Sequence, residues 1–167
     1  MRLRVAEMAS YFGIADWFER DVAALSGGQK QMLNLASVVV MRPDVLILDE
    51  PTAGLDPAGR NSILQMIRDL HAAGGLTVIM VSHSMDDIST LATRLVVMSR
   101  GELVMTGTPR EVFARADELV AAGLDVPQVT RVAMALRAKG LPIDPAVYTV
   151  AELKAALLAL RRGGAVC

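Results

Sequence analysis

The sequence predicts an α/β fold with a mainly parallel sheet, followed by a small helical C-terminal extension. Two short, unbroken apolar runs, 45–48 and 76–81, lie between helical patterns. Runs of this kind are typical of strands buried on both faces of a parallel sheet. A third run, 95–98, follows another helical pattern, and a predicted hairpin turn at 99–102 leads into a further short strand, 103–105. This alternation of strands and helices favours right-handed βαβ connections.

Beyond Gly107 the periodicity is helical only, with helix starts at Thr108 and Thr149. The helix between them is predicted to bury one apolar stripe formed by Val129, Val132, Ala133 and Leu136. We therefore expect two parts, an α/β domain over residues 1–107 and an extension over residues 108–167.

The amino-acid composition limits the classes of function that this protein can have. The net charge of −1 over 167 residues gives none of the basic surplus that nucleic-acid binding requires. The single cysteine, Cys167, rules out an internal disulfide framework and favours a reducing compartment. No apolar run approaches the ~20 residues of a membrane span. The sequence thus predicts a cytoplasmic protein without a nucleic-acid partner.

The segment from Ser26 to Gln29 is predicted to begin a helix, because S-x-x-Q has the spacing of a capping box. Free N–H groups at a helix N-terminus attract anions, and Gly27 and Gly28 let a phosphate approach the backbone closely. The alternative is a well-capped helix with no ligand. On these residues alone the two interpretations are about equally favoured.

Asp49 and Glu50 follow the strand 45–48, at the carboxyl edge where open α/β sheets bind ligands. A carboxylate at Asp49 suits Mg²⁺, and Glu50 is placed to polarise a water molecule for attack on a phosphate. His83 follows the next strand in the same way, so we expect it near the two carboxylates. A structural role is the alternative for His83, and His71 is expected to lie on the surface.

Four short motifs in this order resemble those of ATP-binding-cassette (ABC) ATPases. They are Leu25–Gln29 (signature), Val45–Thr52 (Walker B strand and catalytic glutamate), Ala53–Asp56 (D-loop) and Ser82-His83 (switch histidine). Three further stretches are similar to the ATPase subunits of energy-coupling-factor (ECF) transporters, which import vitamins and transition-metal ions. These stretches are Ser84–Asp87, Gly107–Pro109 and Asp125–Val129.

The resemblance implies an ABC ATPase core of the RecA-like P-loop NTPase fold, with ATP and Mg²⁺ as cofactors. By position, Asp49 would organise Mg²⁺, Glu50 would activate water and His83 would contact the γ-phosphate, while Asp56 would communicate across a dimer. The signature residues Ser26, Gly27, Gly28 and Gln29 would cover the ATP bound to a second ABC ATPase subunit. The family also implies membrane-embedded transporter subunits as partners, and a peripheral location on the inner face of the cell membrane.

The sequence departs from this family at its phosphate-binding loop. No G-x-x-x-x-G-K-[ST] occurs among the 167 residues, and no lysine is followed by Ser or Thr after a glycine. The Q-loop and the strands carrying the adenine-stacking aromatic are also missing. The chain is therefore interpreted as the C-terminal part of such an ATPase, able at most to complete a composite site with an intact partner.

Two alternatives remain at this point. The first is a truncated docking subunit that does not hydrolyse ATP. The second is a DNA-repair or ribosome-linked class of ABC ATPase, although the neutral charge and the stretch from Ser84 onward argue against that class.

Overall fold

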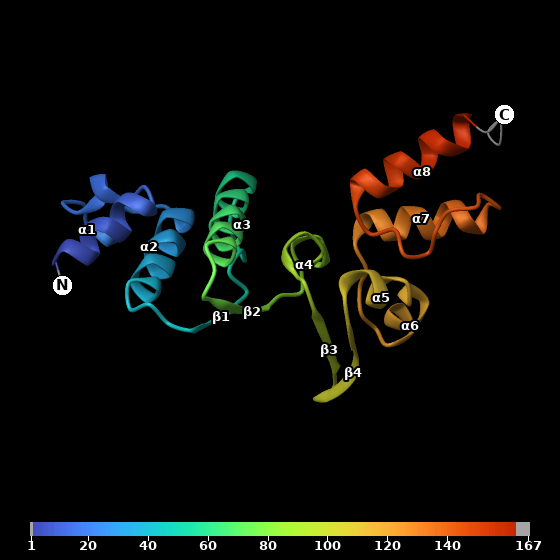
Figure 1. The fold of residues 1–167 in the computed structure, drawn as a ribbon, viewed down its shortest axis with the longest axis horizontal. Coiled ribbons are helices and arrows are strands. Elements are labelled where there is room, and N and C mark those ends of the chain that lie inside the picture. Colours follow the sequence, from blue (N-terminus) through green and yellow to red (C-terminus); the bar gives the residue numbers. More distant parts are fainter. Residues whose placement is uncertain (1, 163–167) are drawn as a thin grey trace. The chain divides into compact units, whose positions relative to one another are not determined.

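The computed structural model describes residues 2–162, which form two compact units that meet at the Ser82–His83 bond (Figure 1). Cys167, on which the expectation of a reducing compartment rests, lies outside the described residues. Within residues 2–162, no helix is both long enough and apolar enough to cross a membrane.

The first unit combines three α-helices with two strands. The helices are α1 (Arg2–Tyr11), α2 (Gly27–Val39) and α3 (Pro57–Ala72). The strands are β1 (Val45–Asp49) and β2 (Thr77–Val81), and two short 3₁₀ turns, η1 (Ala15–Trp17) and η2 (Val22–Ala24), precede α2.

The parallel pairing of β1 and β2 confirms the predicted strand–helix–strand unit. Val45 lies opposite Thr77 and Asp49 opposite Val81, and α3 forms the crossover between the two strands. Helices α2 and α3 pack together and cover one face of this sheet, where Leu46, Ile63 and Ile67 are buried.

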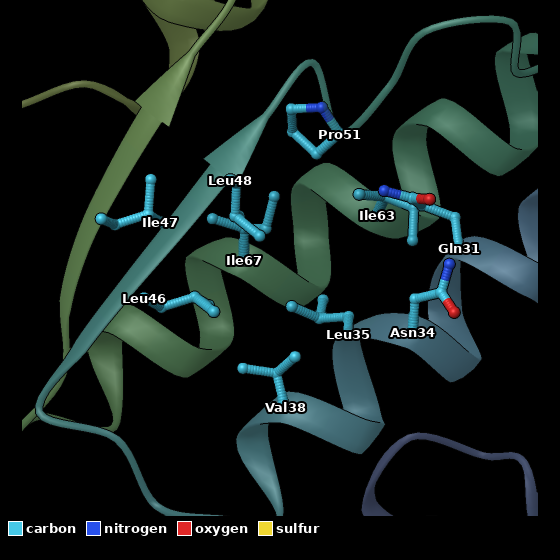
Figure 2. Close-up of a pocket in the computed structure, with 10 residues that line it drawn as sticks. All are labelled: Gln31, Asn34, Leu35, Val38, Leu46, Ile47, Leu48, Pro51, Ile63 and Ile67. Atoms are coloured by element: carbon cyan, nitrogen blue, oxygen red, sulfur yellow. The ribbon is translucent and has the colours of Figure 1, made fainter.

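The expectation that both faces of β1 are buried is wrong for this unit. Ile47, which points away from the helices in Figure 2, is 67% exposed, and Val45, two residues earlier on the strand, is 49% exposed. The alternation of exposed and buried residues along β1 is that of a strand covered on one side only. The helices of this unit therefore bury only one of the two apolar faces of β1.

Helix boundaries in this unit follow the predicted signals. Gly13 adopts a positive φ of 65° after α1, as a left-handed cap requires. Asp56 is the N-cap of α3, where its carboxylate accepts a hydrogen bond from the Gly59 N–H, and Pro57 occupies the first turn. Gly74 and Gly75 follow α3, and their positive φ angles prevent the helix from continuing.

The second unit contains a hairpin and five helices among its described residues. The strands are β3 (Leu95–Ser99) and β4 (Glu102–Gly107). The helices are α4 (Met85–Leu91), α5 (Pro109–Phe113), α6 (Ala116–Ala121), α7 (Gln128–Ala138) and α8 (Val150–Arg162).

The run 95–98 forms a strand as predicted, and the predicted hairpin turn pairs it antiparallel with β4. Arg100 and Gly101, both with positive φ, form the tight turn between these strands. The described residues therefore contain two separate two-stranded sheets, one parallel and one antiparallel, and β3 has no parallel neighbour. Antiparallel strands can be joined by a short turn, so β3 pairs with the strand that follows it directly in the sequence. A parallel neighbour would need a long crossover connection.

The core of the second unit joins the hairpin to the helices that follow it. Leu95 and Met105 share one buried cluster with Val112 and Phe113, so the expected boundary near Gly107 falls inside this unit.

The prediction for the α7 stripe is correct for Ala133 and wrong for Val132. Ala133 is buried, and Val129 and Leu136 pack against the cluster around it, whereas Val132 is 49% exposed. Thr130 is fully buried instead, and its hydroxyl donates a 3.0 Å hydrogen bond to the carbonyl oxygen of Val147, which offsets the cost of burying it.

Candidate functional site

The predicted capping box forms at the start of α2. The Gln29 N–H donates to the Ser26 hydroxyl oxygen at 3.3 Å, and the Gln29 side-chain oxygen accepts from the Ser26 N–H at 2.9 Å. Leu25 is buried and anchors the segment just before the helix. The amides of Gly27 and Gly28 lie in the first turn, where the helix itself provides no acceptor. The cap therefore fixes the loop and leaves those two amides directed out of the helix end.

The first turn of α2 packs against the first turn of α3. A Cβ atom added to Gly28 would lie 3.4 Å from the Cα atom of Gly59, and one added to Gly27 would lie 3.7 Å from Leu55 Cδ2. The Asp56 carboxylate that caps α3 lies beside the same contact, 2.6 Å from the Gly59 nitrogen. Two helix N-termini are thus held together by glycine backbones.

The Asp49–Glu50 pair lies at the carboxyl end of β1. Asp49 is exposed at the last position of the strand, whereas Glu50 is half-buried and adopts a φ of +46°. A left-handed conformation at a residue other than glycine costs on the order of 1–3 kcal/mol and is concentrated at functional sites. Glu50 is held in it by its N–H, which donates to the Val81 carbonyl oxygen at 2.9 Å.

The side chain of Glu50 also has a partner from β2. The Ser82 hydroxyl lies 3.5 Å from Glu50 Oε2, at the end of the strand that pairs with β1. The carbonyl oxygen of Glu50 accepts from the Ala53 N–H at 3.1 Å, which closes the turn into the segment before Asp56. Glu50 therefore links the ends of both strands to this turn.

The first unit contains every predicted site residue except His83. Gly27 and Gly28 lie against the loop and helix start that hold Leu55 and Asp56, and Glu50 is bonded to β2 and to the turn. His83 is exposed and is the first residue of the second unit, so its proximity to the carboxylates stays a prediction. His71 is exposed as expected.

Two residues of this region were not singled out from the sequence. Gly59 occupies the first turn of α3, and a glycine inside a helix is the signal that would have indicated a close contact. In the sequence Ser82 stands out only as the neighbour of His83, and its contact with Glu50 depends on the register of β1 and β2.

A divalent ion fits this site only together with a nucleotide. Across the part of the chain that the structure describes, no group of three or more His, Cys, Asp or Glu side chains is arranged to hold a metal ion. Mg²⁺ in nucleotide sites is commonly held by one or two carboxylates together with phosphate oxygens and water. The exposed carboxylate of Asp49 matches that donor set.

A separate hollow of about 80 Å³, open to solvent, lies between α2, β1 and α3 (Figure 2). Its lining is mostly apolar, with Gln31 and Asn34 of α2 as the polar members. None of the predicted site residues lines it.

Comparison with known proteins agrees with these motifs. Residues 1–53 match the family model described as ABC transporter. The chain is 45% identical over 161 residues to the energy-coupling factor transporter ATP-binding protein EcfA2 of Caldanaerobacter subterraneus, covering 96% of this chain and 56% of the relative. It is 50% identical over 144 residues to EcfA2 of Clostridioides difficile, covering 86% of this chain and 50% of the relative.

Solved structures show the same fold. The structure of cbiO1 from Clostridium perfringens, part of the ABC transporter complex cbiONQ, aligns with a TM-score of 0.65 and 34% identity. That alignment covers 81% of this chain and 53% of the other. An inward-facing putative metal-chelate type ABC transporter aligns with a TM-score of 0.67 at 23% identity, over 72% of this chain and 47% of that chain.

The fold, the motifs and these matches place the chain in the ABC transporter family, within the P-loop NTPase fold class. Within that family it is related to the ATP-binding proteins of ECF transporters. It spans about half the length of the curated relatives that it matches, and corresponds to their C-terminal part.

Proposed function

We propose that this chain is an ATP-binding component of an ECF-type ABC importer, and that it contributes the signature side of a composite nucleotide site. The observation that carries this proposal is the start of α2, where a complete capping box presents the amides of Gly27 and Gly28 at an exposed helix end. The partner is a second ABC ATPase subunit that supplies the phosphate-binding loop.

Each signature residue has a distinct role in this proposal. The amides of Gly27 and Gly28 donate to the γ-phosphate of the partner's ATP, where the positive end of the α2 dipole adds to the attraction. The Ser26 hydroxyl accepts from Gln29 N–H and keeps its own proton to donate to the phosphate. Asp56 lies beside the same glycines, and it couples nucleotide binding at this site to the rest of the dimer interface.

The carboxylates belong to the second site of the pair. If a nucleotide filled that site, Asp49 would hold Mg²⁺, Glu50 would accept a proton from the attacking water and His83 would contact the γ-phosphate. ATP with Mg²⁺ supplies the phosphoryl group and its charge neutralisation. Because the 167 residues contain no G-x-x-x-x-G-K-[ST] motif, we expect no hydrolysis by this chain alone.

The proposed setting follows from the relatives. Their names assign them to energy-coupling factor transporters, so the partners proposed here include membrane-embedded subunits that receive the motion of the ATPase pair. The chain then lies at the inner face of the cell membrane as a peripheral subunit. A vitamin or a metal ion is the proposed solute class.

The test is ATP-dependent association with a full-length partner. The EcfA2 relative from Caldanaerobacter, with the glutamate equivalent to Glu50 replaced by glutamine to prevent hydrolysis, is mixed with this chain in analytical ultracentrifugation. We expect a 1:1 complex with Mg²⁺-ATP and little with Mg²⁺-ADP. Absence of any ATP-dependent complex would overturn the proposal.

A charge variant locates the contact within this chain. Gly27→Glu places a carboxylate where the γ-phosphate is proposed to bind, while an acidic residue in the first turn is favourable for the helix itself. We expect it to weaken the ATP-dependent complex at least tenfold. Ala24→Glu, at an exposed position of η2 just before the signature, is the matched control and should bind as the unmodified chain does.

A non-hydrolysing docking subunit is the second candidate, and the missing phosphate-binding loop favours it. Both candidates predict the ATP-dependent complex. They differ in whether the mixed pair, made with an unmodified partner, turns ATP over.

A further inference from the structure

Helix α4 follows directly on His83, and its placement depends on contacts within the second unit. Ser84 separates His83 from the helix and caps it, because the Ser84 hydroxyl accepts a hydrogen bond from the Asp87 N–H at 3.4 Å. The helix is seven residues long. A helix this short is not stable by itself in water, so packing against neighbouring elements holds it in place. The orientation of α4 therefore directs the course of the backbone at His83.

The apolar face of α4 packs against the helical elements that follow the hairpin. Met85 and Ile88 contact a buried cluster that includes Phe113 of α5 and Val126, which lies in the loop before α7. We call the helices α5 to α8 the helical extension. The inner face of α4 is thus held by this extension as well as by the hairpin.

A hydrogen bond also joins α4 to α7. One carboxylate oxygen of Asp86 accepts from the Gln128 N–H at 3.3 Å, across 42 positions of the sequence. Two stretches singled out in the sequence, Ser84–Asp87 and Asp125–Val129, meet at this bond. Within α7, Pro127 occupies the N-cap position without a side-chain cap, and the first turn contains no acidic residue. The Asp86 carboxylate takes the place of a cap, because it accepts from the helix end and lies at the positive end of the α7 dipole.

We propose that Asp86 is a positioning residue for His83, and that the helical extension sets the orientation of His83 through it. The hydrogen bond fixes the start of α4 to the start of α7, while the buried cluster fixes the inner face of α4. A change in the extension then alters His83, and a change at His83 alters the extension in return. The functional meaning of this coupling rests on the nucleotide contact proposed above for His83. The coupling itself requires neither nucleotide nor partner subunit.

NMR signals of the histidine rings in the full chain, recorded without nucleotide, provide the readout. The chain has two histidines, so His71, exposed on α3 in the first unit, is an internal reference. His71→Gln assigns the signals. Asp86→Ala removes the acceptor, and we expect the His83 signals to shift by more than their line width while those of His71 stay in place. Asp86→Asn keeps a side-chain oxygen acceptor and should restore the His83 signals toward their original position.

Gln128→Pro breaks the same hydrogen bond from the side of the extension. Proline lacks the N–H group but is favoured at the first position of a helix. Pro127 has a ψ of 144°, which a following proline tolerates. We expect the His83 signals to shift in the same direction as in Asp86→Ala. The double variant should shift them by less than the sum of the two single effects, because both substitutions remove one interaction.

Asp117→Ala is the matched control. Asp117 is the second residue of α6, as Asp86 is of α4, so the substitution removes an acidic group from the first turn of a helix in the same unit. The His83 signals should stay unchanged in this variant. Circular dichroism compares the folding of all variants, and Gln128→Pro provides the test if Asp86→Ala does not fold.

Three results would overturn the proposal. They are unchanged His83 signals in the folded Asp86→Ala or Gln128→Pro variant, a shift in Asp117→Ala as large as in Asp86→Ala, and effects of the two linked substitutions that add in full. A response to Asp86→Ala alone would assign the effect to the charge within α4, with no part for the extension. Because these samples contain no nucleotide and no partner, each result is distinct from failure of the ATP-dependent association.

Discussion

Gly28 of α2 and Gly59 of α3 face each other with no side chain between them. A Cβ atom on Gly59 would lie 3.6 Å from the Gly28 Cα atom and 3.1 Å from the Asp56 carboxylate that caps α3. This contact places the signature turn and the cap of the following helix in one rigid arrangement. Disturbing either glycine should therefore affect both helix starts.

Gly59→Val is expected to lower the free energy of unfolding by about 1–3 kcal/mol, because a branched side chain overpacks this contact and displaces the Asp56 cap. Urea denaturation followed by circular dichroism measures the change. Ala58→Val makes a similar change at the preceding, exposed position of α3 and should cost less than about 1 kcal/mol. Equal losses for the two variants would show that the glycine contact has no special role.

Glu50→Gln tests at which of the two nucleotide sites of the mixed pair ATP is hydrolysed. The substitution removes the charge and keeps the length of the side chain, so the contact with Ser82 and the backbone turn should persist. We expect the ATPase rate of a mixed pair with an unmodified full-length partner to stay within about twofold, because this chain lacks the loop that fills its own site. A loss of tenfold or more would place turnover at Glu50 and remove the docking-subunit alternative.

Thr130→Val should destabilise the second unit by about 1–3 kcal/mol, because it removes the buried donor to the Val147 carbonyl while keeping the shape of the side chain. Thr130→Ser keeps the hydroxyl and should lose less. Thermal denaturation of the two variants checks the order. If serine proved the more damaging, packing of the methyl group would outweigh the hydrogen bond.

The stability of the second unit should depend on pH through Glu152. Burial raises the pKa of this carboxyl, but hydrogen bonds from the N–H groups of Tyr148 and Thr149 and from the Thr149 hydroxyl lower it, and the pKa is below the ordinary value of 4.5. A lowered pKa stabilises the folded state fully above the unfolded value. That contribution is lost as the pH falls from about 4.5 through the folded pKa.

Urea midpoints measured between neutral pH and pH 3 test this dependence. In Glu152→Gln the midpoint should be lower at neutral pH, and its decline below pH 4.5 should be shallower than in the unmodified chain. Glu102→Gln, in the β3–β4 hairpin, serves as a charge-matched control. An identical decline in the Glu152→Gln variant would show that other carboxyls account for the acid sensitivity.

Local sequence signals predicted the local structure well. The Ser26–Gln29 capping box, the Asp56 N-cap and the β3–β4 turn depend on residues close together in the chain, and all three form as expected. The parallel pairing of β1 and β2 also follows from the alternation of strands with helices.

The features that sequence reasoning missed depend on long-range neighbours. Burial on both faces of β1 needs a second covering layer, and an apolar run such as Val45–Leu48 contains no information on whether that layer is present. Likewise Thr130 is buried because the Val147 carbonyl meets it from a distant loop, which periodicity along α7 cannot indicate. Gly59 required knowledge of the α2–α3 packing.

The most direct test of the central claim is the number of nucleotides in the complex between this chain and a full-length partner. The partner carries the Gln substitution at its catalytic glutamate, and bound ATP is counted in the isolated 1:1 complex with a radiolabelled nucleotide. The account predicts one ATP per complex, held by the partner's loop and covered by Ser26–Gln29 of this chain. Two ATP molecules per complex, or a complex that forms equally well without ATP, would contradict it.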